Sequence, residues 1–129
     1  MTPRRLLLVF LGGAAGTAAR LALGLWIPEV GGFPVATFAV NVAGSFLIGV
    51  LAARLPQTTD LRVLLGTGVL GGFTTYSAFM TGTVGVWATA PALAVAYAVA
   101  SLVLGLAAAA LGLRLGRPRD VGSTPEGAP

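Results

Sequence analysis

The stretch Gly71-Gly72-Phe73-Thr74-Thr75-Tyr76-Ser77-Ala78-Phe79 places hydroxyl groups, aromatic rings and flexible backbone inside an apolar run from about residue 63 to residue 87. Glycine and β-branched or hydroxyl-bearing residues this close together disfavour a continuous helix. Because an unpaired backbone group in hydrocarbon costs several kcal/mol, a helix that breaks here must bury the break or use its bare carbonyl and N–H groups. Transport proteins place ion sites at such breaks. The stretch therefore predicts an ion site, with Tyr76 and Phe79 on one helical face beside it.

Polar side chains in two other apolar runs can donate hydrogen bonds to an anion. Asn41 is the strongly polar residue inside the run from about residue 34 to residue 53. From its position alone, its amide would bond a neighbouring helix; the motif around it, described below, favours a donor that faces an ion path. Tyr97 and Ser101 are four residues apart, so they share one face of the last apolar run.

Arg20 lies near the end of the first apolar run. Such an arginine either extends its charged head to the membrane surface or attracts anions from a water-filled vestibule. The two interpretations stay open on position alone, and the resemblance described below favours the vestibule.

The elements that must position these groups are transmembrane helices. The sequence has 129 residues, of which 56% are hydrophobic and only 9% are charged, whereas a soluble domain is nearer a quarter charged. A helix of about 20 residues spans the roughly 30 Å of hydrocarbon, and the third run exceeds that length, which suits a helix interrupted near Gly71–Thr75. We predict an all-α membrane protein with one domain over residues 1–113, a disordered basic tail over 114–129, and spans at about 6–26, 34–53, 63–88 and 92–113.

The composition excludes several functions. Without histidine or cysteine the chain lacks the commonest general base, disulfides and thiolate metal sites, so we expect no enzyme. The arginines stand at the ends of apolar runs, which argues against nucleic-acid binding. Two alternatives remain: a small dual-topology multidrug or cation transporter, and a non-conducting structural subunit. Proton coupling requires a carboxylate inside the membrane. All four acidic residues of the sequence lie outside the predicted spans, which disfavours the transporter; they are Glu29, Asp60, Asp120 and Glu126.

Three motifs together resemble the Fluc/CrcB fluoride channel family. The stretch Gly71–Phe79 is similar to the signature Gly-Gly-x-Thr-Thr-Phe-Ser-Thr-Phe, Gly12–Arg20 to the first-helix pattern, and Thr37–Phe46 to the second-helix pattern. The motifs follow in order over residues 6 to about 113. The resemblance implies passive, fluoride-specific export across the cell membrane by an antiparallel dimer, with a structural sodium ion, not transported, at the dimer centre.

The resemblance also implies roles for individual residues. Tyr76 stands where the family has phenylalanine, Ala78 where it often has threonine, and Gly82 where some members have glutamate. The sodium ion would be held by the backbone carbonyls of Gly71 and Thr74, Arg20 would line the vestibule, and the ion pathway would comprise Asn41, Thr75, Tyr76, Ser77, Phe79, Tyr97 and Ser101.

The arginines predict an orientation. Four spans place both termini and the middle loop on one side of the membrane, together with every arginine except Arg20. The positive-inside rule then places the termini in the cytoplasm. An antiparallel pair, however, contains one inverted subunit. The partner is therefore either a second copy of this chain or a related subunit with the opposite bias, and both interpretations stay open.

Overall fold

The computed structural model describes residues 2–118, and their secondary structure is almost wholly helical. Within these residues four helical spans are long and apolar enough to cross a membrane, which confirms a multi-pass, all-α membrane protein. The third span, Asp60–Thr89, is assembled from four shorter segments. The elements are α1 (Pro3–Trp26), α2 (Val35–Arg54), α3 (Asp60–Arg62), the π-helix η1 (Val63–Leu70), α4 (Gly71–Phe73), α5 (Tyr76–Thr89) and α6 (Pro91–Gly116).

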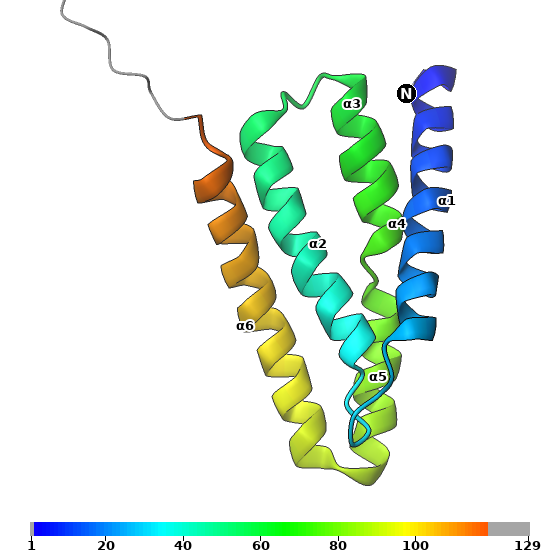
Figure 1. Ribbon diagram of the computed structural model, residues 1–129, viewed down its shortest axis with the longest axis vertical. Helices are drawn as coiled ribbons and strands as arrows, with labels where there is room; N and C mark the ends of the chain where they lie inside the picture. The colour runs from blue at the N-terminus through cyan, green and yellow to red at the C-terminus, as the bar shows by residue number, and fades with distance from the viewer. Residues whose placement is uncertain (1, 119–129) are drawn as a thin grey trace, which may run out of the picture.

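The spans lie side by side, with the start of α1, the α2–α3 loop and the end of α6 at one end of the molecule (Figure 1). The other end holds the loop between α1 and α2 and the turn between α5 and α6. Gly31 and Gly32 allow the first of these connections to turn tightly, because both have positive φ angles of 58° and 81°. Pro91 begins α6 directly after Ala90, at the position where a missing N–H costs nothing.

Glycines bring the backbones of neighbouring spans into contact. A Cβ atom at Gly72 would overlap the carbonyl of Gly13, so α4 touches α1 along its backbone. On the other side of the molecule, a Cβ at Gly112 would overlap the carbonyl of Phe46, so α6 lies equally close to α2. Small residues at such crossings allow the close packing that stabilises helix pairs in lipid.

The interruption of the third span confirms the predicted broken helix, but it lies after the glycines. Gly71 is helical, with φ −63° and ψ −36°. Thr74 and Thr75 are extended, with ψ angles of 157° and 118°. The chain restarts as a helix there because the Thr75 hydroxyl accepts the Ala78 N–H at 3.1 Å and caps α5. Gly72 therefore serves helix packing, and the two threonines form the break.

The π-helix η1 was not predicted. At its end the Gly71 N–H donates a hydrogen bond to the carbonyl of Gly66, five residues earlier. Gly68, on the same segment, packs against Gly12 of α1. Short π-helical segments occur often at functional sites, and this one leads directly into α4 and the break.

The outer helix α6 continues to Gly116, into the segment predicted as a disordered tail. Its last turn is helical because Gly116 packs on the backbone of Val50 and because the Arg54 Nε donates to the Gly116 carbonyl at 3.3 Å. The part of the predicted tail from residue 119 onward lies outside the described residues.

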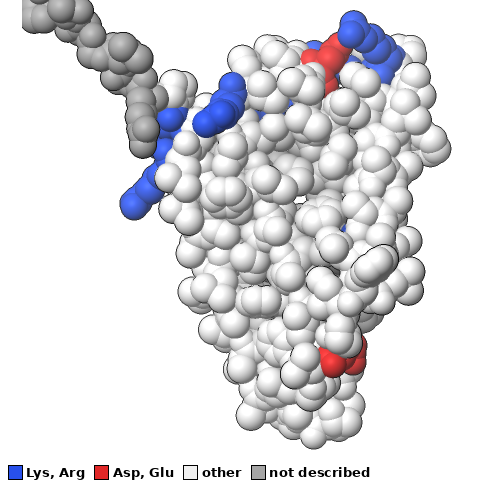
Figure 2. All heavy atoms as spheres, in the orientation of Figure 1, with Lys and Arg blue, Asp and Glu red and all other residues white. Residues whose placement is uncertain are grey.

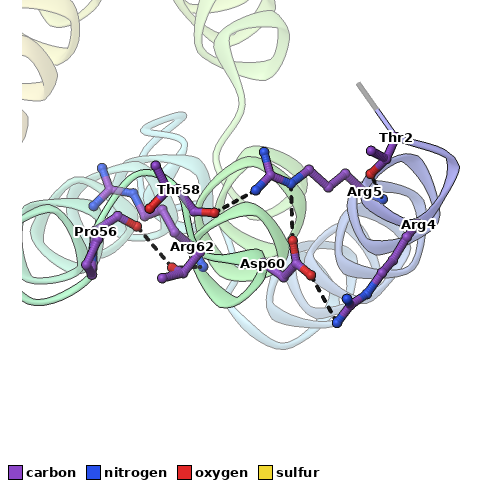
Figure 3. Close-up of polar contacts among 8 residues, drawn as sticks. Thr2, Arg4, Arg5, Pro56, Thr58, Asp60 and Arg62 are labelled. Carbon is purple, nitrogen blue, oxygen red and sulfur yellow. Dashed lines mark hydrogen bonds and ion pairs between the residues drawn. The ribbon is translucent and has the colours of Figure 1, made fainter.

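An ion-pair cluster joins the start of α1 to the start of the third span (Figure 3). Asp60 pairs with Arg4 at 3.0 Å and with the Arg5 Nε at 3.1 Å. The Arg5 guanidinium also donates to the carbonyl of Thr58 at 2.6 Å. Because Arg5 contacts both the α2–α3 loop at Thr58 and the start of α3 at Asp60, this cluster fixes α1 beside the span that carries the break.

The surface is as apolar as a lipid-facing protein requires. Phe10 is 72% exposed, Leu25 88% and Leu106 76%, whereas a water-soluble monomer rarely shows a continuous apolar surface of this extent. On the face shown in Figure 2, basic atoms gather at the end that holds the N-terminus and the end of α6, and the surface between the two ends is almost free of charge.

Candidate functional site at the helix break

Asn41 of α2 holds the break with both ends of its amide. Its Nδ2 donates to the carbonyl of Thr75 at 2.9 Å, and its Oδ1 accepts the Thr75 N–H at 2.8 Å. An extended residue inside a membrane span leaves its backbone groups without helical partners, and the half-buried amide of Asn41 satisfies both the N–H and the carbonyl of Thr75. The second N–H of the Asn41 Nδ2 is not used in these two hydrogen bonds. That this N–H donates to an ion remains a prediction.

The same hydrogen bonds free two carbonyl oxygens. In a continuous helix the Gly71 carbonyl would accept the Thr75 N–H, which here goes to Asn41. Likewise the Thr74 carbonyl would accept the Ala78 N–H, which here goes to the hydroxyl of Thr75. The two carbonyls that the sequence analysis named as sodium ligands are thus the ones whose helical donors are taken by side chains.

The carbonyl of Gly72 points to the opposite side of the break, toward α1. It accepts from Thr17 Oγ1 at 3.4 Å and from Arg20 Nε at 3.3 Å. Arg20 is only partly exposed, so its charge lies beside the break rather than fully at the membrane surface. A guanidinium there satisfies a free helix carbonyl and adds positive potential to this part of the span.

A partly open pocket of about 400 Å³ lies on the other side of the break, between α2, α6 and the third span. It contains most of the predicted pathway and sodium residues. Ser77 and Tyr97 are not among its lining residues, although the Ser77 hydroxyl lies 3.2 Å from the Thr75 hydroxyl. The predicted residues that line it are Asn41, Gly71, Thr74, Thr75, Tyr76, Phe79 and Ser101.

Aromatic rings continue from this pocket toward the α1–α2 loop. The Phe79 ring lies 6.1 Å from Tyr76 and 5.6 Å from Tyr97, and Tyr97 meets Phe33 edge to face at 5.2 Å. Ring edges carry positive partial charge and can face an anion. Tyr76 is 74% exposed, so its phenol lies on the open side of this row, whereas Tyr97 is completely buried.

Two buried hydroxyl groups on α6 have no hydrogen-bond partner within residues 2–118. They are Tyr97 Oη and Ser101 Oγ, one helical turn apart. Burying a hydroxyl without a partner costs free energy, and such a pair is a place where water or a polar ligand binds. Both residues were predicted to belong to the ion pathway.

The part of the chain that the structure describes holds no carboxylate at this site. Glu29 lies in the α1–α2 loop and Asp60 in the ion-pair cluster with Arg4 and Arg5. No group of three histidine, cysteine or acidic side chains suited to a metal occurs in the described residues. A cation at the break would therefore depend on backbone and hydroxyl oxygens, which suit a hard ion such as sodium.

The sequence itself matches a known family over most of its length. Residues 7–113 match the family described as CrcB-like protein, Camphor Resistance (CrcB). The chain belongs to the CrcB family. The predicted family resemblance is thereby confirmed.

CrcB relatives from several bacteria align with nearly the whole chain. The protein named fluoride-specific ion channel FluC 2 of Rhodococcus jostii (strain RHA1) is 50% identical over 111 residues, which are 84% of this chain and 96% of that protein. FluC 2 of Leifsonia xyli subsp. xyli (strain CTCB07) is 46% identical over 121 residues, 88% and 83% of the two chains. The fluoride-specific ion channel FluC of Agrobacterium fabrum (strain C58) is 46% identical over 117 residues, 85% and 94%. These relatives are named as ion channels, which confirms the prediction that the chain is not an enzyme.

Three further residues of this CrcB chain contribute to the site and were not named from the sequence. Thr17 bonds the Gly72 carbonyl, Ser45 lines the pocket, and Phe33 extends the row of rings. Thr17 and Ser45 lie inside the first-helix and second-helix motifs, so those motifs carried a signal for them. Phe33 lies outside all three motifs, and only the packing of its ring on Tyr97 identifies it.

Proposed function

We propose that this chain is a subunit of a fluoride-specific channel that lets fluoride leave the cell passively. The observation that carries the proposal is a family match over residues 7–113 together with a pocket of donors and ring edges that contains no carboxylate. Fluoride is small and strongly hydrated, so a pore must replace its water with donors that do not hold it too firmly. The hydroxyls of Tyr97 and Ser101, which have no hydrogen-bond partner among the described residues, are suited to that exchange.

The channel is a dimer of antiparallel subunits in the plasma membrane. The pocket at the break is partly open, and Tyr76 and Leu102 at its edge are exposed, so a second subunit packed there would close the path. Sodium at the centre of that dimer would be held by the carbonyls of Gly71 and Thr74. Their loss of helical donors supports this assignment. The partner is either a second copy of the chain or a related subunit.

A small multidrug or cation transporter has less support. Coupling to protons requires an ionisable carboxylate within a span, whereas the two described acidic residues lie in the α1–α2 loop (Glu29) and at the first position of the third span (Asp60). A non-conducting subunit would have no use for unpartnered hydroxyls at Tyr97 and Ser101.

Liposomes that contain the purified chain, either alone or together with a related CrcB subunit if that is its partner, test the proposal. Loaded with potassium fluoride or potassium chloride and given valinomycin, they should release fluoride and retain chloride, without any proton gradient. Equal release of both halides would contradict fluoride specificity. Protein-free liposomes and liposomes with Asn41→Asp protein serve as controls for leakage.

The same liposomes test the sodium site. Purification and reconstitution with N-methylglucamine in place of sodium should abolish fluoride release, and added sodium should restore it. Full release without sodium would remove the ion from the proposal and leave the channel function intact.

A further inference from the structure

A second pocket, of about 450 Å³, lies at the arginine-rich end of the molecule, between the ends of α2 and α6. It is lined by Arg54, Arg114, Leu115, Arg117 and Pro118. The two helices run in the same direction and end side by side there (Figure 1). They lie so close because Gly112 and Gly116 leave no side chain between them. The packing of α2 on α6 therefore brings Arg54 beside Arg114 and Arg117, which lie about 60 residues later in the sequence.

Among residues 2–118, no acidic side chain lines this pocket. Asp60, the acid at the same end of the described chain, is engaged by Arg4 and Arg5 on the α1 side. Arg54 donates to the Gly116 carbonyl, which holds its guanidinium at the pocket and leaves its other N–H groups available. The two helix C-termini offer roughly half a negative charge each, which is less than the positive charge of three guanidinium groups. The described groups that line the pocket thus carry a net positive charge.

We propose that this pocket binds the phosphate of an anionic phospholipid headgroup. Arginine matches phosphate oxygens with paired N–H groups, and basic pockets between transmembrane helices are suited to such headgroups. The surroundings favour a lipid over a free phosphate ion. Leu115 lines the pocket and is 61% exposed, and Leu111, one turn earlier on α6, is 50% exposed. An acyl chain can follow this apolar surface while its headgroup lies among the arginines.

Lipid binding to the full-length protein in detergent tests this proposal. Native mass spectrometry would count bound dilauroyl phosphatidylglycerol, with dilauroyl phosphatidylcholine as the zwitterionic comparison. Arg114→Gln and Arg117→Gln, made separately, should each weaken binding of phosphatidylglycerol about fivefold, the effect of one arginine near an anionic surface. The matched control is Arg4→Gln, because Arg4 is a 79% exposed arginine at the same end of the molecule but outside the pocket. It should leave the affinity unchanged.

Four outcomes would overturn the proposal. Equal weakening by Arg4→Gln would show diffuse attraction to a basic end rather than a site. Equal binding of the two lipids would remove the role of the headgroup charge. Displacement of phosphatidylglycerol by millimolar inorganic phosphate would assign the pocket to a free anion. Unchanged binding in both pocket variants, with thermal unfolding showing that they are folded, would place the lipid elsewhere.

Discussion

At the scale of single residues, Asn41 has two roles that a flux measurement alone would not separate. Its amide closes two hydrogen bonds with the backbone of Thr75, and the same side chain lines the pocket of the proposed ion path. An amide fits because it donates from one end and accepts at the other. An aspartate can accept the Thr75 N–H but cannot donate to the Thr75 carbonyl.

Replacement of Asn41 by aspartate should therefore lower both fluoride flux and stability. A carboxylate would face the Thr75 carbonyl, and the loss of this partly buried hydrogen bond should reduce the free energy of unfolding by about 1–3 kcal/mol. Its negative charge would also repel an anion. The measurement is fluoride efflux from liposomes together with thermal unfolding in detergent.

Ser45→Ala is the control for this change. Ser45 lines the same pocket, but its hydroxyl bonds only the carbonyl of Asn41 within the same helix, at 2.8 Å. Folding should survive this substitution. Full flux and full stability in Asn41→Asp would contradict both roles of the amide.

At the scale of elements, the adjacent glycines Gly71 and Gly72 have different surroundings. A Cβ at Gly72 would overlap the backbone of Gly13, whereas a Cβ at Gly71 would meet only the Gly66 carbonyl at 3.8 Å, an ordinary contact. Gly72→Ala should thus force α4 away from α1 and destabilise the protein by about 1–3 kcal/mol. Gly71→Ala should be close to neutral, because alanine favours the helical conformation that Gly71 adopts.

Thermal unfolding of the two variants measures this difference. Gly24→Ala is a second control, since a Cβ at Gly24 would meet nothing within 4 Å. Equal destabilisation by Gly71→Ala and Gly72→Ala would show that both glycines are needed for backbone flexibility, rather than Gly72 for contact with α1. The break at Thr74 would then depend on the glycines after all.

At the scale of the whole molecule, charge is distributed unevenly between the two ends (Figure 2). Arg20 bonds the Gly72 carbonyl beside the break, away from the basic end. The described arginines at that end, where the N-terminus, the α2–α3 loop and the end of α6 meet, are Arg4, Arg5, Arg54, Arg62, Arg114 and Arg117. The positive-inside rule predicts a cytoplasmic location for this end.

Single cysteines test the orientation, because the chain has none of its own. Gln57→Cys lies in the α2–α3 loop and Val30→Cys in the α1–α2 loop, at opposite ends. In intact cells an impermeant maleimide should label Val30→Cys and spare Gln57→Cys. That pattern would make the antiparallel partner a related subunit with the opposite bias. Equal labelling at both positions would contradict the charge prediction and identify two copies of this chain in opposite orientations.

The sequence alone determined the number of spans, the interruption of the third and the family. These features are local: an apolar run long enough for the membrane, threonines that cap a new helix, and motifs that are contiguous along the chain. The length and hydrophobicity of a spanning helix can be read from one apolar run, because in lipid the backbone N–H and C=O groups of each span must hydrogen-bond within that span. No contact between spans had to be known.

Only the tertiary structure decided which groups meet. The partners of Asn41 and Arg20 lie 34 and 52 residues away, and the pocket of Arg54 with Arg114 depends on how α6 crosses α2. Within the predicted range Gly71–Thr75, it also placed the break at Thr74 and Thr75 and assigned Gly72 to the contact with α1. A glycine that breaks a helix and one that packs a helix look the same in a sequence. The neighbouring backbone distinguishes them, since only a close approach leaves no room for a Cβ.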